Sequence, residues 1–229
     1  MKLPSFKRWI YKMDYKHGGR AIQNLMLIIS AGMLIVLVGG MVNPQVYNYL
    51  TLDRGAILHG QVWRLFTFIF MPPMGSGLFF TLIGIYFYYF IGSSLEGAWG
   101  AFRFNVYYLC GVVALIISAM ITGYADAYFL NMSLFFAFAA LFPEQQVLLF
   151  FVIPIKIKWL AWLDAALFVF QFIFGNWVTR GSILAVLIVF VIFFWEDIIN
   201  AFKNFQNYLK MRKQRNNYNN GGNNRINFR

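Results

Sequence analysis

The sequence predicts an all-α membrane protein that crosses the bilayer six times. Of its 229 residues, 60% are hydrophobic and only 12% are charged, which is too little charge to cover the surface of a soluble domain. The apolar residues fall into six runs of membrane-spanning length. Once these runs are taken as spans, the basic residues gather on one side of the membrane.

The six apolar runs each have about the 20 residues that a helix needs to cross a hydrocarbon core of roughly 30 Å. Because lipid cannot hydrogen-bond the backbone, each run must be a helix. The fourth run is the shortest. The predicted spans are residues 22–42, 78–98, 104–124, 127–143, 159–175 and 181–199.

The external segment between the first two spans, residues 43–77, differs from an ordinary loop. It is too apolar to lie free in water, and Asn43-Pro44 and Pro72-Pro73 interrupt it too often for a span. We therefore expect a structured, membrane-embedded element that lies partly in the outer leaflet.

The distribution of Lys and Arg predicts the orientation. With a cytosolic N-terminus, 16 of the 19 basic residues lie on the cytosolic side, and only Arg54, Arg64 and Arg180 lie outside. Both termini are then cytosolic. The predicted parts are a basic N-terminal segment (1–21), a six-helix membrane domain (22–200) and a basic, Asn-rich, largely disordered cytosolic tail (201–229).

The basic tails flank membrane spans, so the sequence favours membrane lipids as their partner and argues against nucleic acid. The lone Cys110 sits inside an apolar run, which indicates a core position. We expect no metal and no cofactor, because the sequence has neither a metal-ligand cluster nor a nucleotide-binding motif. The sequence does not predict the oligomeric state.

An ordered set of motifs runs from the external segment to the third span. A Trp-Arg pair precedes the second span, and a Gly-x3-Glu-x3-Gly-x2-Arg pattern lies between the second and third spans. The residues are Trp63, Arg64, Gly92, Glu96, Gly100 and Arg103. Within six spans, this set resembles the rhomboid superfamily over about residues 22–200. The resemblance implies a rhomboid-like bundle.

Active members of that superfamily are intramembrane serine proteases, with a Gly-x-Ser-Gly motif opening the fourth helix and a His in the sixth. The serine needs a base within about 3 Å. In this chain, residues 131–134 occupy the position of that motif; they include Ser133 but neither glycine. The sequence has two histidines, His17 and His59, and both precede the second span. We therefore expect no catalytic residue, with Ser133 as a vestige.

The resemblance thus points to the catalytically inactive branch, in which derlins bind membrane or misfolded clients. Gly181-x3-Ala185 is similar to the small-x3-small motif of the derlin sixth helix, although such a pattern is common in apolar helices.

Several polar residues have two readings. For Ser133 we favour a hydrogen bond to its own helix backbone over a client contact. For Arg64 we favour anchoring of the external segment, to head groups or backbone carbonyls, over a plain interfacial position. For Glu96 and Arg103 we expect a charge pair that closes the turn between the second and third helices.

Asp164 and Gln171 lie within the fifth span, where a polar side chain is a functional candidate by default. Both are candidates for client or lipid contact. The alternative for Asp164 is neutralisation by the nearby Lys156 and Lys158, and for Gln171 a hydrogen bond between helices.

The leading functional hypothesis is a non-proteolytic, rhomboid-fold protein that binds transmembrane or misfolded membrane clients in quality control or trafficking. The short fourth span and the embedded external segment would perturb the bilayer locally. One alternative is an intramembrane protease that uses Ser133 without a family-type His. Another is a small transporter or channel. The sequence favours a bacterial plasma membrane, with the endoplasmic reticulum as the alternative.

Overall fold

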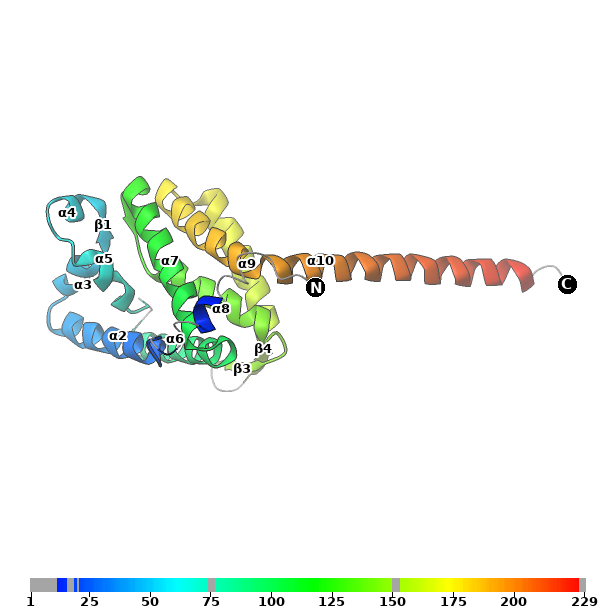
Figure 1. Cartoon of the computed structure of the whole chain (residues 1–229), viewed down its shortest axis with the longest axis horizontal. Helices are drawn as coiled ribbons and strands as arrows, with labels where there is room; N and C mark the ends of the chain where they lie inside the picture. The colour runs from blue at the N-terminus through cyan, green and yellow to red at the C-terminus, as the bar shows by residue number, and fades with distance from the viewer. Residues whose placement is uncertain (1–11, 16–18, 20, 74–76, 150–152, 227–229) are drawn as a thin grey trace. The chain divides into compact units, whose positions relative to one another are not determined.

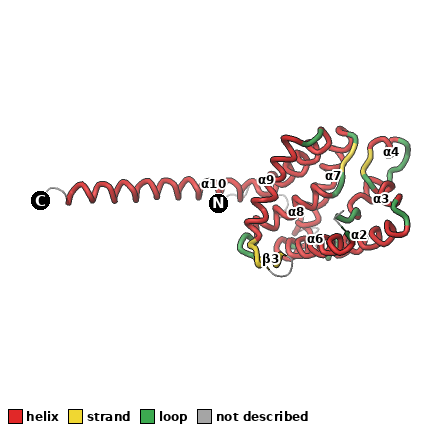
Figure 2. Tube along the Cα trace, turned by 180° about the vertical axis from the view of Figure 1, so that it is seen from behind, coloured by secondary structure: helices red, strands yellow, loops and turns green. Residues whose placement is uncertain are grey.

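The computed structural model describes residues 12–15, 19, 21–73, 77–149 and 153–226. The chain divides into two compact units, residues 1–190 and 191–229, and each is described by itself. Most of the first unit is helical, as Figures 1 and 2 show. The last helix begins in the first unit and continues into the second.

Among the described residues, five helices are long and apolar enough to cross a membrane, and each coincides with a predicted span. The fourth predicted span is a helix of only 14 residues. An all-α membrane protein is therefore confirmed, whereas the sixth crossing stays a prediction. The helices are α2 (Leu25–Val42), α6 (Leu78–Trp99), α7 (Ala101–Thr122), α8 (Tyr128–Leu141), α9 (Ile157–Phe174) and α10 (Trp177–Ile226).

The short helix α8 is the centre of the first unit. Nine of its 14 residues are buried, and it contacts α6, α7 and α9. Phenylalanine pairs fill these contacts: Phe138 lies edge-on to Phe90 of α6, and Phe136 lies edge-on to Phe168 of α9. Offset and edge-on ring contacts of this kind stabilise a packed core beyond the area that they bury.

Glycines allow three pairs of helices to approach closely. A Cβ at Gly92 of α6 would overlap the Met26 side chain of α2, and one at Gly111 of α7 would overlap Leu130 of α8. A Cβ on Gly181 of α10 would lie 2.5 Å from the methyl carbon of Thr122 in α7. Small residues at helix contacts are a common means of close packing in membranes.

The external segment is structured, as the sequence predicts. It folds as α3 (Gln45–Leu50), β1 (Leu52–Asp53), α4 (Arg54–Leu58), α5 (Arg64–Thr67) and the 3-10 turn η2 (Phe68–Phe70). β1 pairs antiparallel with β2 (Tyr124–Ala125), which follows α7. This pairing ties the external segment to the connection between α7 and α8.

Large side chains of this segment also meet glycines of the spans. The Phe70 ring lies against Gly32 of α2, and the Tyr47 ring lies against Gly40 of the same helix. Pro73 lies against Gly84 of α6, 2.7 Å from the position that a Cβ would take. The segment is therefore packed onto the first two spans.

The connection between α8 and α9 contains a hairpin that the sequence analysis did not predict. β3 (Gln146–Leu149) pairs antiparallel with β4 (Ile153–Lys156). At its base, Glu144 accepts hydrogen bonds from Lys156 at 2.7 Å and Lys158 at 2.5 Å. These two ammonium groups lower the pKa of the Glu144 carboxyl to about 2.

The expectation that residues 201–229 are largely disordered stays a prediction. In the structure α10 continues as a helix to Ile226. No proline follows Pro154, so nothing in the sequence stops the helix sterically. Residues 227–229 lie outside the described part of the chain.

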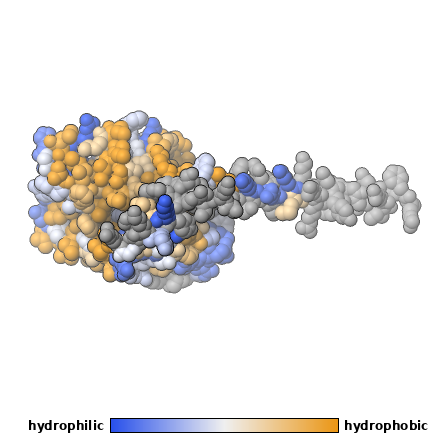
Figure 3. Space-filling view, in the orientation of Figure 1, coloured by the Kyte–Doolittle hydropathy of each residue, from blue (hydrophilic) through white to orange (hydrophobic). Residues whose placement is uncertain are grey.

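The outer faces of the spans are apolar, as a lipid-facing surface requires. Ile35 of α2 is 73% exposed and Trp162 of α9 is 74% exposed. Figure 3 shows hydrophobic residues over much of the visible face of the first unit, with hydrophilic residues mostly at its edges. Large exposed apolar area of this kind marks contact with a membrane or a partner.

The packing at Gly92 generates a test with a matched control on the same helix. Gly92→Ala forces Met26 to move, so we expect destabilisation of about 1–3 kcal/mol. Gly97→Ala meets nothing within 4 Å, and we expect it to be neutral or stabilising by up to about 1 kcal/mol. Thermal unfolding in detergent measures both. Equal melting temperatures would contradict the close α2–α6 contact.

Candidate functional site

Ser133 lies in the buried interior of α8 and is 4% exposed. Its hydroxyl donates to the Leu130 carbonyl of the same helix at 2.8 Å. Its own carbonyl accepts a hydrogen bond of 3.2 Å from the Tyr107 hydroxyl of α7. The Ser133 hydroxyl therefore bonds its own helix backbone, as we predicted from the sequence.

The described histidine does not serve Ser133. His59 is exposed at the end of α4, and its Nδ1 lies 2.7 Å from the Gly55 carbonyl. His17 lies outside the described residues. Among the described residues, the Ser133 hydroxyl is hydrogen-bonded to the Leu130 carbonyl, and the Tyr107 hydroxyl bonds the Ser133 backbone carbonyl.

The Trp-Arg pair holds the external segment together. Arg64 is 6% exposed, and its guanidinium donates to the carbonyls of Asn48 at 2.6 Å and Thr51 at 2.9 Å. The Trp63 indole donates to the Tyr49 carbonyl at 3.2 Å. These bonds satisfy the carbonyls at the end of α3, so backbone carbonyls, rather than lipid head groups, are the partners of Arg64.

The expected pair of Glu96 and Arg103 is wrong. Arg103 instead forms an ion pair of 3.2 Å with Asp14, and Glu96 accepts a hydrogen bond of 2.6 Å from the Asn24 backbone. The turn between them is closed by Gly100 with a φ of +84°, a conformation that glycine adopts at little cost. No local pattern indicates Asp14 as the partner of Arg103, because the two residues lie 89 positions apart in the chain.

Gly181 and Ala185 of the small-x3-small motif line one apolar groove, of about 400 Å³, between α7 and α10. At one end of the groove, Arg180 donates to the carbonyls of Phe172 at 2.9 Å and Ile173 at 2.7 Å. Arg180 therefore caps the last turn of α9, which explains an arginine at this external turn.

Asp164 and Gln171 lie seven residues apart on α9, on the face that packs on α8, where Phe168 is buried. The Gln171 side chain lies near the Tyr128 hydroxyl of α8. The Asp164 carboxylate oxygen Oδ2 is buried and has no hydrogen-bond partner among the described residues.

The expected neutralisation of Asp164 by lysines is wrong as well. Lys156 and Lys158 both bind Glu144 instead. Asp164 is therefore a half-buried acid within a span and is not paired with either lysine. An ionisable residue in such a position is a candidate for a functional role.

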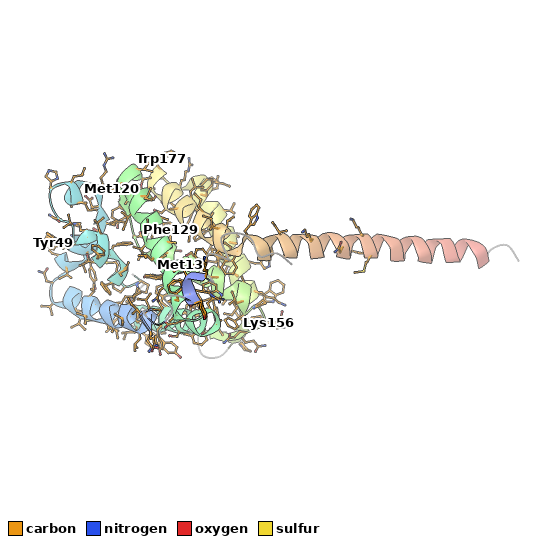
Figure 4. The ribbon with its side chains drawn as sticks, viewed as in Figure 1. Met13, Tyr49, Met120, Phe129, Lys156 and Trp177 are labelled. Atoms are coloured by element: carbon orange, nitrogen blue, oxygen red, sulfur yellow. The ribbon has the colours of Figure 1, made fainter. Side chains whose placement is uncertain are left out.

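A cavity of about 280 Å³ lies above the start of α8. Its polar lining consists of three tyrosines, Asp126 and Asn131. In Figure 4, Met120 and Trp177 lie at one end of the helices and Lys156 at the other. Tyr124 and Asp126 follow Met120 closely in the chain, so the cavity is at the end away from Lys156. The polar lining residues are Tyr88, Tyr124, Asp126, Tyr128 and Asn131.

Two of the residues that line this cavity carry buried hydrogen-bond acceptors. Asp126 accepts a hydrogen bond of 2.8 Å from the Tyr128 backbone, and burial raises the pKa of its carboxyl. Asn131 is 2% exposed, and its Oδ1 has no hydrogen-bond partner among the described residues. The sequence analysis missed Tyr88, Tyr124 and Asn131 as a group, because three separate elements bring them together.

Comparison with known proteins gives one finding about the family. The model of a family described as "Eukaryotic integral membrane protein (DUF1751)" matches residues 23–196, which is 174 of the 229 residues. No curated protein matches the chain. The eukaryotic description overturns the bacterial plasma membrane that the sequence analysis favoured.

The anchoring role of Arg64 predicts a large loss of stability. Arg64→Ala removes the guanidinium donor from the carbonyls of Asn48 and Thr51, of which the Asn48 carbonyl still accepts from the Thr51 hydroxyl, and we expect destabilisation of about 2–4 kcal/mol. Arg64→Lys keeps the charge but loses the planar fork, so about half of that loss is expected. Thermal unfolding in detergent is the measurement.

The exposed Arg54 provides the control, because it begins α4 in the same segment. Arg54→Ala should change stability by less than about 0.5 kcal/mol. If Arg54→Ala and Arg64→Ala were equally stable, the buried hydrogen bonds of Arg64 would not hold the segment.

Proposed function

The chain belongs to the family described as eukaryotic integral membrane proteins, and from that premise we propose that it is a rhomboid-fold protein without proteolytic activity that binds transmembrane or misfolded membrane clients. Roles in quality control or trafficking suit such binding. The observation that carries the proposal is the position of Asp164, a partnerless acid on a helix that the protein covers only slightly.

The helix α9 is the least covered of the candidate spans. Only 11% of its apolar window is buried, against 33% for α2 and α6 and 44% for α7. Its contacts with the rest of the first unit are chiefly with α8. A client helix can therefore approach α9 from the lipid without displacing another span.

The chemistry of the inner face of α9 favours clients with polar spans. A charged or amide side chain in lipid is costly unless it finds a partner. Asp164 is half-buried on the face of α9 that packs on α8, and its buried Oδ2 is an unused acceptor that a client group would reach by inserting beside α8. A basic or amide group in a client span gains this partner, whereas an all-leucine span gains nothing.

The second part of the proposal is that the protein perturbs the bilayer locally, and we attribute this effect to the lipid-facing helices. The short helix α8 is largely buried among other helices, so a mismatch between its length and the bilayer thickness does not act directly on lipid. The lipid-facing helices α2 and α9 have 18 residues each, about 27 Å, slightly less than a core of roughly 30 Å. Mismatch of this size costs fractions of a kcal/mol per Å and draws in short or polar spans.

The client-binding proposal is tested by photocrosslinking in reconstituted vesicles. A crosslinker at Leu167 of α9 is compared with one at Ile35 of α2, both exposed. The probes are two single-span peptides that differ only in one mid-span lysine. We expect severalfold more crosslinking of the lysine peptide at Leu167 and no difference at Ile35.

The Asp164→Leu variant should lose the preference for the lysine peptide, while Asp164→Asn, which keeps an acceptor, should retain part of it. Equal yields for both peptides at Leu167 would contradict client selection by α9.

The lack of proteolysis is tested separately. Ser133 bonds its own helix and has no described imidazole partner, so we expect no labelling by a fluorophosphonate probe. Ser133→Ala serves as the background. Labelling of the wild type above that background, together with cleavage of a membrane-embedded peptide, would establish the protease instead.

A further inference from the structure

The cavity above α8 has a chemical character of its own. Three tyrosines, from α6, α8 and the connection before α8, line it together with Asp126 and Asn131. None of the lining residues in the described part of the chain is Lys, Arg or His. The cavity therefore offers aromatic rings and acceptors but no basic group.

The volume of the cavity sets the size of its occupant. One turn of an α-helix about 10 Å wide fills about 420 Å³, since a turn rises about 5.4 Å. The cavity measures about 280 Å³. It cannot hold a client helix, but it can hold a head group or a small ligand.

The charge around the cavity favours a cation. The ionised side chains that act on Tyr88, Tyr124 and Tyr128 from the described residues are all acidic: Asp53, Asp126 and Asp164. Burial of Asp126 without a basic partner disfavours its charged form, and this raises the pKa of its carboxyl. A bound cation would remove that penalty.

A second and independent feature points into the same space. Asn131 is 2% exposed and lines the cavity, and its Oδ1 has no described partner. A buried amide oxygen without a donor costs about 1–3 kcal/mol. A ligand with a positive surface offsets that cost.

We propose that this cavity binds a quaternary ammonium group of the choline type, held by the rings of Tyr88, Tyr124 and Tyr128 and by the Asp126 carboxylate. Aromatic faces with one carboxylate suit a cation that cannot donate hydrogen bonds, and this is how quaternary ammonium groups are bound elsewhere. A primary ammonium has three donors to satisfy. Asp164, the residue proposed for client contact, does not line this cavity.

The test uses the full chain in nanodiscs of phosphatidylglycerol, which contain no choline. Saturation-transfer NMR on the methyl signal of free choline reports binding. We expect saturation with the wild type and at least a tenfold weaker affinity for Asp126→Asn, whose side chain can still accept from the Tyr128 backbone.

Two controls separate the site from general effects. Glu144→Gln removes the same charge from an exposed carboxylate in the α8–α9 connection and should leave choline binding unchanged. Tyr124→Phe keeps the ring and should bind within about twofold of the wild type, whereas Tyr124→Leu should weaken binding about 2- to 30-fold. If Asp126→Asn cannot be reconstituted, the two Tyr124 variants still test the site.

A second arm identifies the source of the ammonium. In nanodiscs of mixed phosphatidylcholine and phosphatidylglycerol, native mass spectrometry shows which lipid stays bound. Retention of phosphatidylcholine that free choline displaces assigns a lipid head group. Choline binding without lipid preference assigns a small ligand, and both outcomes support the proposal.

Three results would overturn it. One is equal choline saturation in the wild type and in both Asp126→Asn and Tyr124→Leu. Another is saturation of butylammonium but not of choline, which would assign a primary amine. The third is equal binding of glycerophosphate, which would show that the cavity does not select for positive charge.

Discussion

The burial of one short helix governs the rest of this structure. α8 has 14 residues, about 21 Å, and nine of them are buried. It is held by α6, α7 and α9 through rings such as Phe138 against Phe90, and by Gly111, which lets Leu130 approach α7. A helix about 9 Å shorter than the bilayer core can be tolerated here because protein, not lipid, surrounds it.

The shortness of α8 has consequences at both of its ends. Above its first turn, the external segment and β2 do not fill the space completely, and the tyrosine-lined cavity results. Beyond its last turn, the chain returns through the antiparallel β3–β4 hairpin. Polar features are thus possible at the ends of α8 but are costly along its middle.

Much of the fold could be predicted from the sequence because it follows from local composition. The spans agree with the helices to within a few residues at most boundaries, and the external segment is structured as its apolar residues and prolines indicate. The partners of charged residues could not be predicted. Arg103 pairs with Asp14 and Glu96 with Asn24, because pairs that are close in sequence compete with distant groups that the fold brings nearer. The hairpin was missed because a short apolar run does not distinguish a strand from a loop.

Among the described residues, Asn105, Asn131 and Asp164 each have a buried amide or carboxylate oxygen without a hydrogen-bond partner, and the last two bear on the proposed functions. A serine hydroxyl can bond its own helix backbone, as that of Ser133 does. A carboxylate or an amide cannot do this easily within a helix. Asp164 and Asn131, on the contacting helices α9 and α8, each keep a buried oxygen unused, and an apolar residue at either position would avoid a cost of about 1–3 kcal/mol. The stability of the bundle does not explain Asp164 and Asn131, and the binding roles proposed for them would: Asn131 lines the cavity, and Asp164 lies on the least buried of the candidate spans.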